Sequence, residues 1–124
     1  MYITSIFPIT DNSGALTFSC IKIYGKIKHA RSVEVGDIIL GCVQTYNAKR
    51  LKKQYHKKLM KALCLSVPKI VRLCDGRVLL CMYASVIILH KDNIPLARRI
   101  FCPIPKILIR RGHYKVAALT YALV

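Results

Sequence analysis

Thr10-Asp11-Asn12-Ser13-Gly14-Ala15 gathers four turn-forming residues and leads directly into the apolar segment 16–24. Asp, Asn and Ser side chains bond their own backbone and Gly tolerates a positive φ, so this stretch predicts a tight turn. In the following segment the apolar side chains alternate as far as Cys20 and then change phase. Alternation with a period of two is typical of a half-buried strand. The phase change predicts a bulge or strong bend near Cys20.

Short apolar runs and turn signals continue to alternate through most of the chain. Glu34-Val35-Gly36-Asp37 is a second turn, Pro68 closes a later strand, and Asp75-Gly76 is a strong signal for a two-residue hairpin. These signals predict strands over residues 38–43, 62–67, 70–74, 78–80 and 86–89.

The pattern changes after Asp92-Asn93. Pro103 and Pro105 open a segment, residues 106–111, in which apolar side chains face away from basic neighbours, and Gly112 follows it. This arrangement predicts one or two short helical turns.

We therefore predict a mainly β fold, a small five-stranded β-barrel, because a closed barrel removes the exposed edges of so hydrophobic a sheet. At 124 residues the chain has the length of one domain, residues 1–124. The barrel is expected over about residues 1–92 and the C-terminal helical segment over about residues 93–124.

The charge of the chain points to an anionic partner. Lys and Arg number 21 against 5 Asp and Glu, a formal net charge of +16, although 54% of the residues are hydrophobic. So apolar a composition argues against disorder. Self-repulsion from this charge opposes compaction unless RNA, DNA or an anionic membrane neutralises it. Only four basic residues precede Lys49, so the second half should supply most of the anion-binding surface.

The densest basic run places seven positive charges within thirteen residues, with Tyr46, Tyr55 and His56 near or among them. A solvated loop without function is the alternative interpretation. Because the excess charge is balanced nowhere else, we favour contact with RNA phosphates. The run comprises Lys49, Arg50, Lys52, Lys53, Lys57, Lys58 and Lys61.

A second basic group lies toward the C-terminus, and two arginines flank the predicted hairpin. Arginine is planar and always charged, which suits it to phosphate binding. Phe101, beside this group, is expected to be a buried core residue. The candidate RNA-binding residues here are Arg72, Arg77, Arg98, Arg99, Lys106, Arg110, Arg111 and Lys115.

Other classes of function find little support. The six cysteines lack the two-to-four-residue spacing of a zinc site and are interpreted as small buried hydrophobes in a reducing compartment, so we expect no metal and no cofactor. All five acidic residues lie in turn contexts, and no activated nucleophile appears, so we expect no enzyme. The longest apolar stretch, residues 78–89, is shorter than the roughly 20 residues of a membrane span.

Four motifs stand in a characteristic order: Thr10-Asp11-Asn12-Ser13-Gly14-Ala15, Cys20-Ile21-Lys22-Ile23-Tyr24-Gly25, Val35-Gly36-Asp37-Ile38-Ile39 and Pro95-Leu96-Ala97-Arg98-Arg99-Ile100-Phe101-Cys102-Pro103. Together they resemble the family of the universal fourteenth protein of the large ribosomal subunit. The likeness runs from about Ile9 to the last residue.

The resemblance implies a five-stranded barrel with a projecting β-hairpin and short C-terminal helices. It implies a structural constituent of the large subunit that binds rRNA and has no enzymatic reaction. Its implied partners are large-subunit rRNA and neighbouring large-subunit proteins near the subunit interface. Small-subunit rRNA at an intersubunit bridge and a ribosome-silencing factor are further implied partners.

The chain also departs from the family pattern. Cys81-Met82-Tyr83-Ala84 stands where the family carries an acidic Asp-x-Asn group, and Thr120-Tyr121-Ala122 replaces a closing Ala-Pro-Glu. Drift toward apolar residues and Cys, in a chain rich in Ile, Lys and Tyr, is more like an organellar sequence. We expect a ribosome of the mitochondrial matrix and a protein made inside the organelle, because no import segment precedes the core. Bacterial cytoplasm and plastid are the alternatives.

A free single-stranded nucleic-acid-binding protein of barrel type is the alternative function. Such modules stack bases on aromatic side chains. This chain has few aromatic side chains for such stacking: no Trp, three Phe and seven Tyr.

Overall fold

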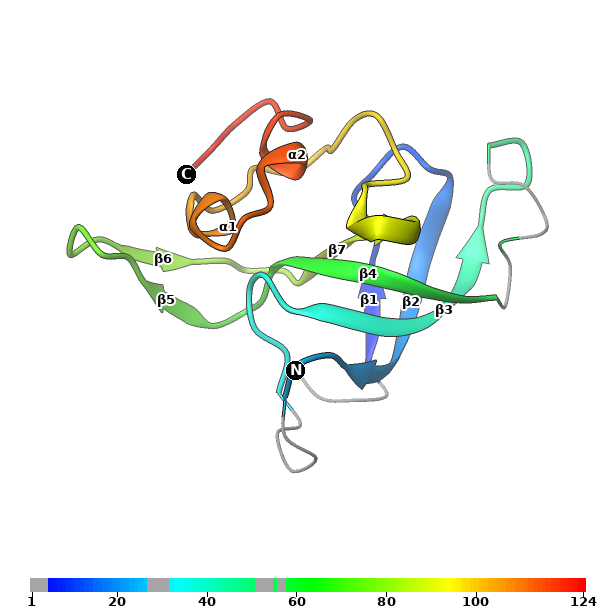
Figure 1. The fold of residues 1–124 in the computed structure, drawn as a ribbon, viewed down its shortest axis with the longest axis horizontal. Coiled ribbons are helices and arrows are strands. Elements are labelled where there is room, and N and C mark those ends of the chain that lie inside the picture. Colours follow the sequence, from blue (N-terminus) through cyan, green and yellow to red (C-terminus); the bar gives the residue numbers. More distant parts are fainter. Residues whose placement is uncertain (1–4, 27–31, 51–54, 56–57) are drawn as a thin grey trace.

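The computed structural model describes residues 5–26, 32–50, 55 and 58–124. Its fold is mainly β, as predicted: a five-stranded antiparallel sheet in the order β1-β2-β3-β4-β7 and a separate two-stranded sheet, β5-β6 (Figure 1). The strands are β1 (Ile6–Pro8), β2 (Ala15–Ile23), β3 (Ile38–Tyr46), β4 (Leu59–Ser66), β5 (Ile70–Arg72), β6 (Val78–Leu80) and β7 (Ser85–Leu89).

The β2–β3 pair forms the longest contact of the sheet and contains the predicted bulge. The register shifts between Cys20 and Lys22, where the phase of the apolar side chains changes. Opposite Cys20 stands Gly41, where a Cβ atom would lie 1.8 Å from the Ser19 carbonyl oxygen and 2.8 Å from the Phe18 ring. Only glycine allows the two backbones to approach so closely.

Three details of the strand prediction need correction. Strand β1 was not predicted, because it is three residues long and ends at Pro8. Strand β4 begins at Leu59, so Lys61 lies in a strand and not in a loop. The hairpin is confirmed, but its loop has three residues, since the Leu73 N–H donates to the Arg77 oxygen (2.8 Å). Gly76 closes this loop with a φ of 83°.

The residues directly after β1 form an isolated bridge with β7, the other outer strand of the large sheet. Ile9 forms an isolated parallel bridge with Val86, and the Thr10 N–H donates to the Val86 oxygen (3.2 Å). No continuous ladder joins β1 to β7 within the described residues. Closure of the sheet into a barrel therefore stays a prediction.

The C-terminal segment covers the sheet and completes the core. Figure 1 shows α2 (Tyr114–Ala117) above the end of β4 and α1 (Ile107–Arg110) beside it, toward the β5–β6 hairpin. Ile104, Leu108 and Val116 are buried in the same cluster as the side chains of the sheet, which is why β7 is buried on both faces. Helix α1 confirms the predicted helical turns, whereas α2 was implied only by the family resemblance.

Phe101 is not the core residue that we predicted, since it is 59% exposed. Ile100 is buried in its place and forms bridges to both Asp11 and Thr120. The extended backbone directs neighbouring side chains to opposite faces, and it is Ile100 that faces inward.

The Asp11 carboxylate joins the first turn to the centre of the core. One oxygen accepts from the Ser13 N–H (2.9 Å) and from the Ser13 hydroxyl, and the other accepts from the Ile88 N–H (3.1 Å). Burial raises the pKa of Asp11, and these hydrogen bonds oppose that rise. The carboxylate thus satisfies a buried strand amide that would otherwise lack this partner.

The C-terminal segment packs against the second turn, residues 34–37. Asp37 accepts from the Glu34 N–H (2.8 Å) and pairs with Lys26 (2.8 Å) and Arg111 (3.5 Å). A Cβ atom on Gly36 would lie 2.5 Å from the Arg111 Cδ, so the arginine side chain packs directly on the glycine.

Replacing Asp11 with Ala should lower the free energy of unfolding by about 2–4 kcal/mol, because the buried Ile88 N–H loses its acceptor. Urea unfolding followed by circular dichroism measures this. Asp75→Ala is the matched control, since among the described residues Asp75 accepts only from the exposed Arg77. Equal unfolding midpoints for the two variants would contradict the role assigned to Asp11.

Stability should fall as the pH is lowered through the ordinary imidazole pKa of 6.5, in part because of His113. Burial, helped by the Arg111 charge, lowers the pKa of His113 in the folded state, so the unfolded state binds its proton more tightly. The contribution of neutral His113 is complete above 6.5 and is lost below it. Urea unfolding at pH values about one unit on either side of that pKa, for the natural chain and His113→Asn, measures the effect. An unchanged pH dependence in the variant would refute it.

Candidate nucleic-acid interface

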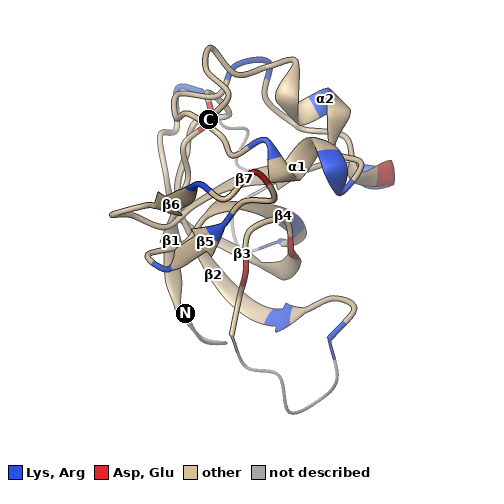
Figure 2. Cartoon of the chain, turned by 90° about the vertical axis from the view of Figure 1, so that its left-hand side faces the viewer, with Lys and Arg blue, Asp and Glu red and all other residues tan. Residues whose placement is uncertain are grey.

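Twelve of the predicted RNA-binding residues lie in the described part of the chain, and all but one are exposed. The exception is Lys61, half-buried in β4. Lys52, Lys53 and Lys57 fall outside the described residues. Figure 2 shows the basic positions distributed over β5, α1 and α2 and the loops around them, with few acidic positions nearby.

The described ends of the first basic run differ in structure. Lys49 and Arg50 lie in a turn after β3, where their N–H groups donate to the Asn47 side-chain and backbone oxygens (both 3.1 Å). At the other end, the Lys61 ammonium lies 5.3 Å from the centre of the Tyr24 ring. That distance is typical of a cation–π contact, which leaves the charge available to a further partner.

Arg98 and Arg99 are held by their backbone and not by their side chains. Both N–H groups donate to the Asn12 side-chain oxygen, at 3.2 and 3.3 Å, and the Arg99 carbonyl accepts from the Asn12 N–H (3.2 Å). Within the described residues no ion pair joins either guanidinium to an acid. The backbone of the two arginines is therefore fixed, whereas no acid in the described part of the chain holds their guanidinium groups.

The fold brings this segment next to the first basic run. Arg50 and Arg98 line one shallow pocket of about 350 Å³, together with Asn12, Ser13 and Tyr55. The sequence predicted the two basic clusters separately, and it carried no signal of this juxtaposition, which depends on the turn at Asn12.

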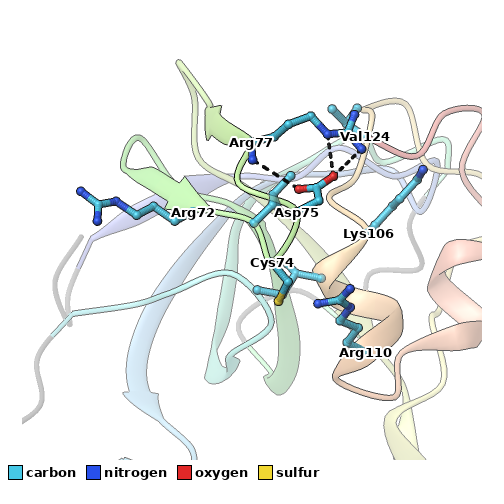
Figure 3. Close-up of a pocket in the computed structure, with 9 residues that line it drawn as sticks. Arg72, Cys74, Asp75, Arg77, Lys106, Arg110 and Val124 are labelled. Atoms are coloured by element: carbon cyan, nitrogen blue, oxygen red, sulfur yellow. Dashed lines mark hydrogen bonds and ion pairs between the residues drawn. The ribbon is translucent and has the colours of Figure 1, made fainter.

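A second basic pocket lies between the β5–β6 hairpin and α1. It has a volume of about 100 Å³, and Figure 3 shows Lys106 and Arg110 reaching it from the C-terminal segment. Arg77 enters from the hairpin, whereas the guanidinium of Arg72 points away. A pocket of this size with flexible cations at its rim suits one phosphate group.

Two of the predicted residues are already paired within the chain. Both Nε and an Nη atom of Arg77 lie 2.6 Å from the Asp75 carboxylate, and this hydrogen bonding lowers the pKa of Asp75. Arg111 pairs with Asp37. Lys106 and Arg110 have no such partner among the described residues, so they are the stronger candidates for an external anion.

The cysteines are only partly as predicted. All six are free thiols, but only Cys20 and Cys64 are buried, and Cys74 is exposed at the hairpin loop. Burial raises the pKa of Cys64 to about 12, so its thiol stays protonated at neutral pH. The described ranges contain no group of three potential metal ligands. They also contain no helix long and apolar enough to span a membrane.

Comparison with known proteins agrees with this arrangement of a β-rich scaffold and exposed cations. A family model described as ribosomal protein L14p/L23e matches residues 1–124, the full length of the chain. Proteins of this family are structural and not enzymatic. The chain therefore belongs to the ribosomal protein L14p/L23e family and is a structural component of the large ribosomal subunit that binds rRNA.

Proposed function

We propose that residues 1–124 act as one rRNA-binding domain with two contact surfaces. The first, called here the Asn12 surface, comprises Lys49, Arg50, Arg98 and Arg99. The second is the basic pocket lined by Arg77, Lys106 and Arg110, with Arg72 at its edge. Additional phosphate contacts are proposed for Lys52, Lys53, Lys57, Lys58, Lys61, Arg111 and Lys115.

One observation carries this proposal: Asn12 orients two adjacent arginines whose charges have no acidic partner in the described structure. Because the backbone is already fixed, less backbone entropy is lost when the two arginines bind. Contacts of this kind position a protein on the RNA backbone without reading its sequence. The Asn12 surface is therefore suited to placing the chain on folded rRNA.

We further propose that the chain lies near the subunit interface of a mitochondrial ribosome and contacts small-subunit rRNA at an intersubunit bridge. As part of the same proposal, the chain binds a ribosome-silencing factor. Likeness to the family supports the interface position, and the enrichment in Ile, Lys, Tyr and Cys supports the organelle. Bridge formation would use cations left free by the large-subunit rRNA.

Replacing Arg98 and Arg99 together with Ala should reduce the salt dependence of RNA binding without unfolding the protein. Loss of two phosphate contacts predicts a decrease of about 1.4–1.8 in the slope of log K against log salt. The N–H groups that bond Asn12 remain, so the melting temperature should change little. A salt titration by filter binding measures the slope.

The matched control is Lys22→Ala with Lys91→Ala, which removes two exposed charges outside the predicted set. An equal loss of slope in the control would show that charge alone matters and not its position. Exclusion of the double arginine variant from sedimenting large subunits is expected, whereas the control should be incorporated. Free migration of the natural chain with single-stranded DNA, in place of sedimentation with the large subunit, would favour the alternative function.

Asn12→Ala should weaken incorporation into the large subunit while preserving every positive charge. The variant removes the oxygen that accepts from the Arg98 and Arg99 N–H groups and so frees the segment. We expect affinity for rRNA to fall with an unchanged salt slope, because the number of available cations is the same. A decreased slope would mean that Asn12 does not act by positioning alone.

A further inference from the structure

A hollow with an apolar lining lies where the start of β4 pairs with the end of β7, at the position where Lys61 stands opposite Leu89. It has a volume of about 490 Å³. Leu40, Met60 and Leu89 form its apolar lining, and the last two are buried. A cavity of this size, apolar with a few polar groups at its rim, is typical of a site for a small flat ligand.

Asp92 supplies an acidic group to this hollow and is exposed. The other four acids of the chain accept hydrogen bonds or pair with cations, but within the described residues no hydrogen bond or ion pair holds the Asp92 carboxylate. Asp92 and Asn93 have φ angles of 64° and 58°, in a region that residues other than glycine seldom adopt. Backbone strain of this kind is concentrated at ligand sites.

The chemistry of the hollow selects one class of ligand. An ionised carboxylate only accepts hydrogen bonds, and its two oxygens can accept two at once. The Watson–Crick edge of guanine carries two adjacent donors, N1–H and the N2 amino group, whereas each of the other RNA bases has a single donor group on that edge. An unpaired guanine therefore matches the Asp92 carboxylate, and its flat face matches the apolar lining.

The cations at the hollow fit the rest of a nucleotide. Lys58 and Lys61 line it together with Asp92, and their charges suit the phosphate of the same nucleotide. The same two lysines disfavour a divalent cation, which also needs several oxygen ligands and not one carboxylate.

Tyr55 connects this hollow to the Asn12 surface. It lines both the hollow and the shallow pocket that contains Arg50 and Arg98. Aromatic side chains between basic groups are typical of proteins that bind single-stranded RNA. An RNA strand that crosses Tyr55 can place one base in the hollow and a neighbouring phosphate against the two arginines.

We propose that the hollow binds the base of an unpaired guanosine of rRNA and that Asp92 recognises its Watson–Crick edge. The proposal rests on the proposed function, since the neighbouring phosphate is bound at the Asn12 surface. It adds base recognition to surfaces that otherwise contact phosphates. A free guanine nucleotide carries the same base, and the experiment must distinguish these two sources.

Short oligouridine RNAs with one central guanosine, adenosine or inosine test the site by fluorescence anisotropy with the full chain. Inosine keeps the N1–H donor of guanosine and lacks the N2 amino group. We expect the guanosine RNA to bind about tenfold or more tighter than the other two. Asp92→Asn should remove this preference, because one acceptor oxygen becomes an amide donor. Glu34→Gln is the matched control, since Glu34 lies outside both hollows, and it should keep the preference.

Equal affinity of the natural chain for the three RNAs, or a guanosine preference that survives in Asp92→Asn, would overturn the base site. Guanosine monophosphate is the second probe: displacement of the guanosine RNA by equimolar nucleotide would show a site for the free nucleotide and overturn its assignment to rRNA. The salt slope of Asp92→Asn for the adenosine RNA should equal that of the natural chain. Loss of the base site therefore leaves that slope intact, whereas a slope near zero for the natural chain would refute the proposed function.

Discussion

The Asp11 carboxylate is the interaction on which the arrangement of the chain depends. It is buried, which raises its pKa, and it is retained because it accepts hydrogen bonds from Ser13 and from the Ile88 N–H. Ile88 lies in the fully buried strand β7, while Asp11 also forms a backbone bridge with Ile100. Through its side chain and its backbone together, this one residue therefore joins the first turn, the last strand of the sheet and the C-terminal segment. A buried acceptor so placed constrains the register of all three.

Asn12 extends this constraint from the core to the surface. Its side chain fixes the backbone of Arg98 and Arg99, as the Asp11 carboxylate beside it fixes Ile88. The inward position of Ile100 follows, and the arginines then project away from the core. The residues that specify the fold and those that place the RNA-binding charges thus share one turn. Substitution of Asp11 should therefore affect folding, whereas substitution of the neighbouring Asn12 should affect assembly.

The sequence predicted what depends on local chemistry and missed what depends on tertiary contact. Alternation and turn residues located β2, β3 and the hairpin, and the phase change at Cys20 located the bulge. Strand β1 is too short for a periodic signal, and the inward choice of Ile100 over Phe101 depends on its bridges to Asp11 and Thr120. Among site residues, composition identified exposed cations but could not show that Arg111 pairs with Asp37, a residue far away in the sequence.

The few acidic residues serve the fold, and this leaves the positive charge for the partner. Asp11 accepts buried amides, while Asp37 and Glu34 pair with Lys26, and Asp75 pairs with Arg77. Each of these acids stabilises a turn or its immediate surroundings, and the five Asp and Glu residues together still leave a net charge of +16. Self-repulsion then destabilises the isolated chain, and binding to rRNA adds stability that grows with the logarithm of the rRNA concentration divided by its Kd. The fold and the ribosomal site are therefore coupled, because the charge that destabilises the free protein is the same charge that binds it to rRNA.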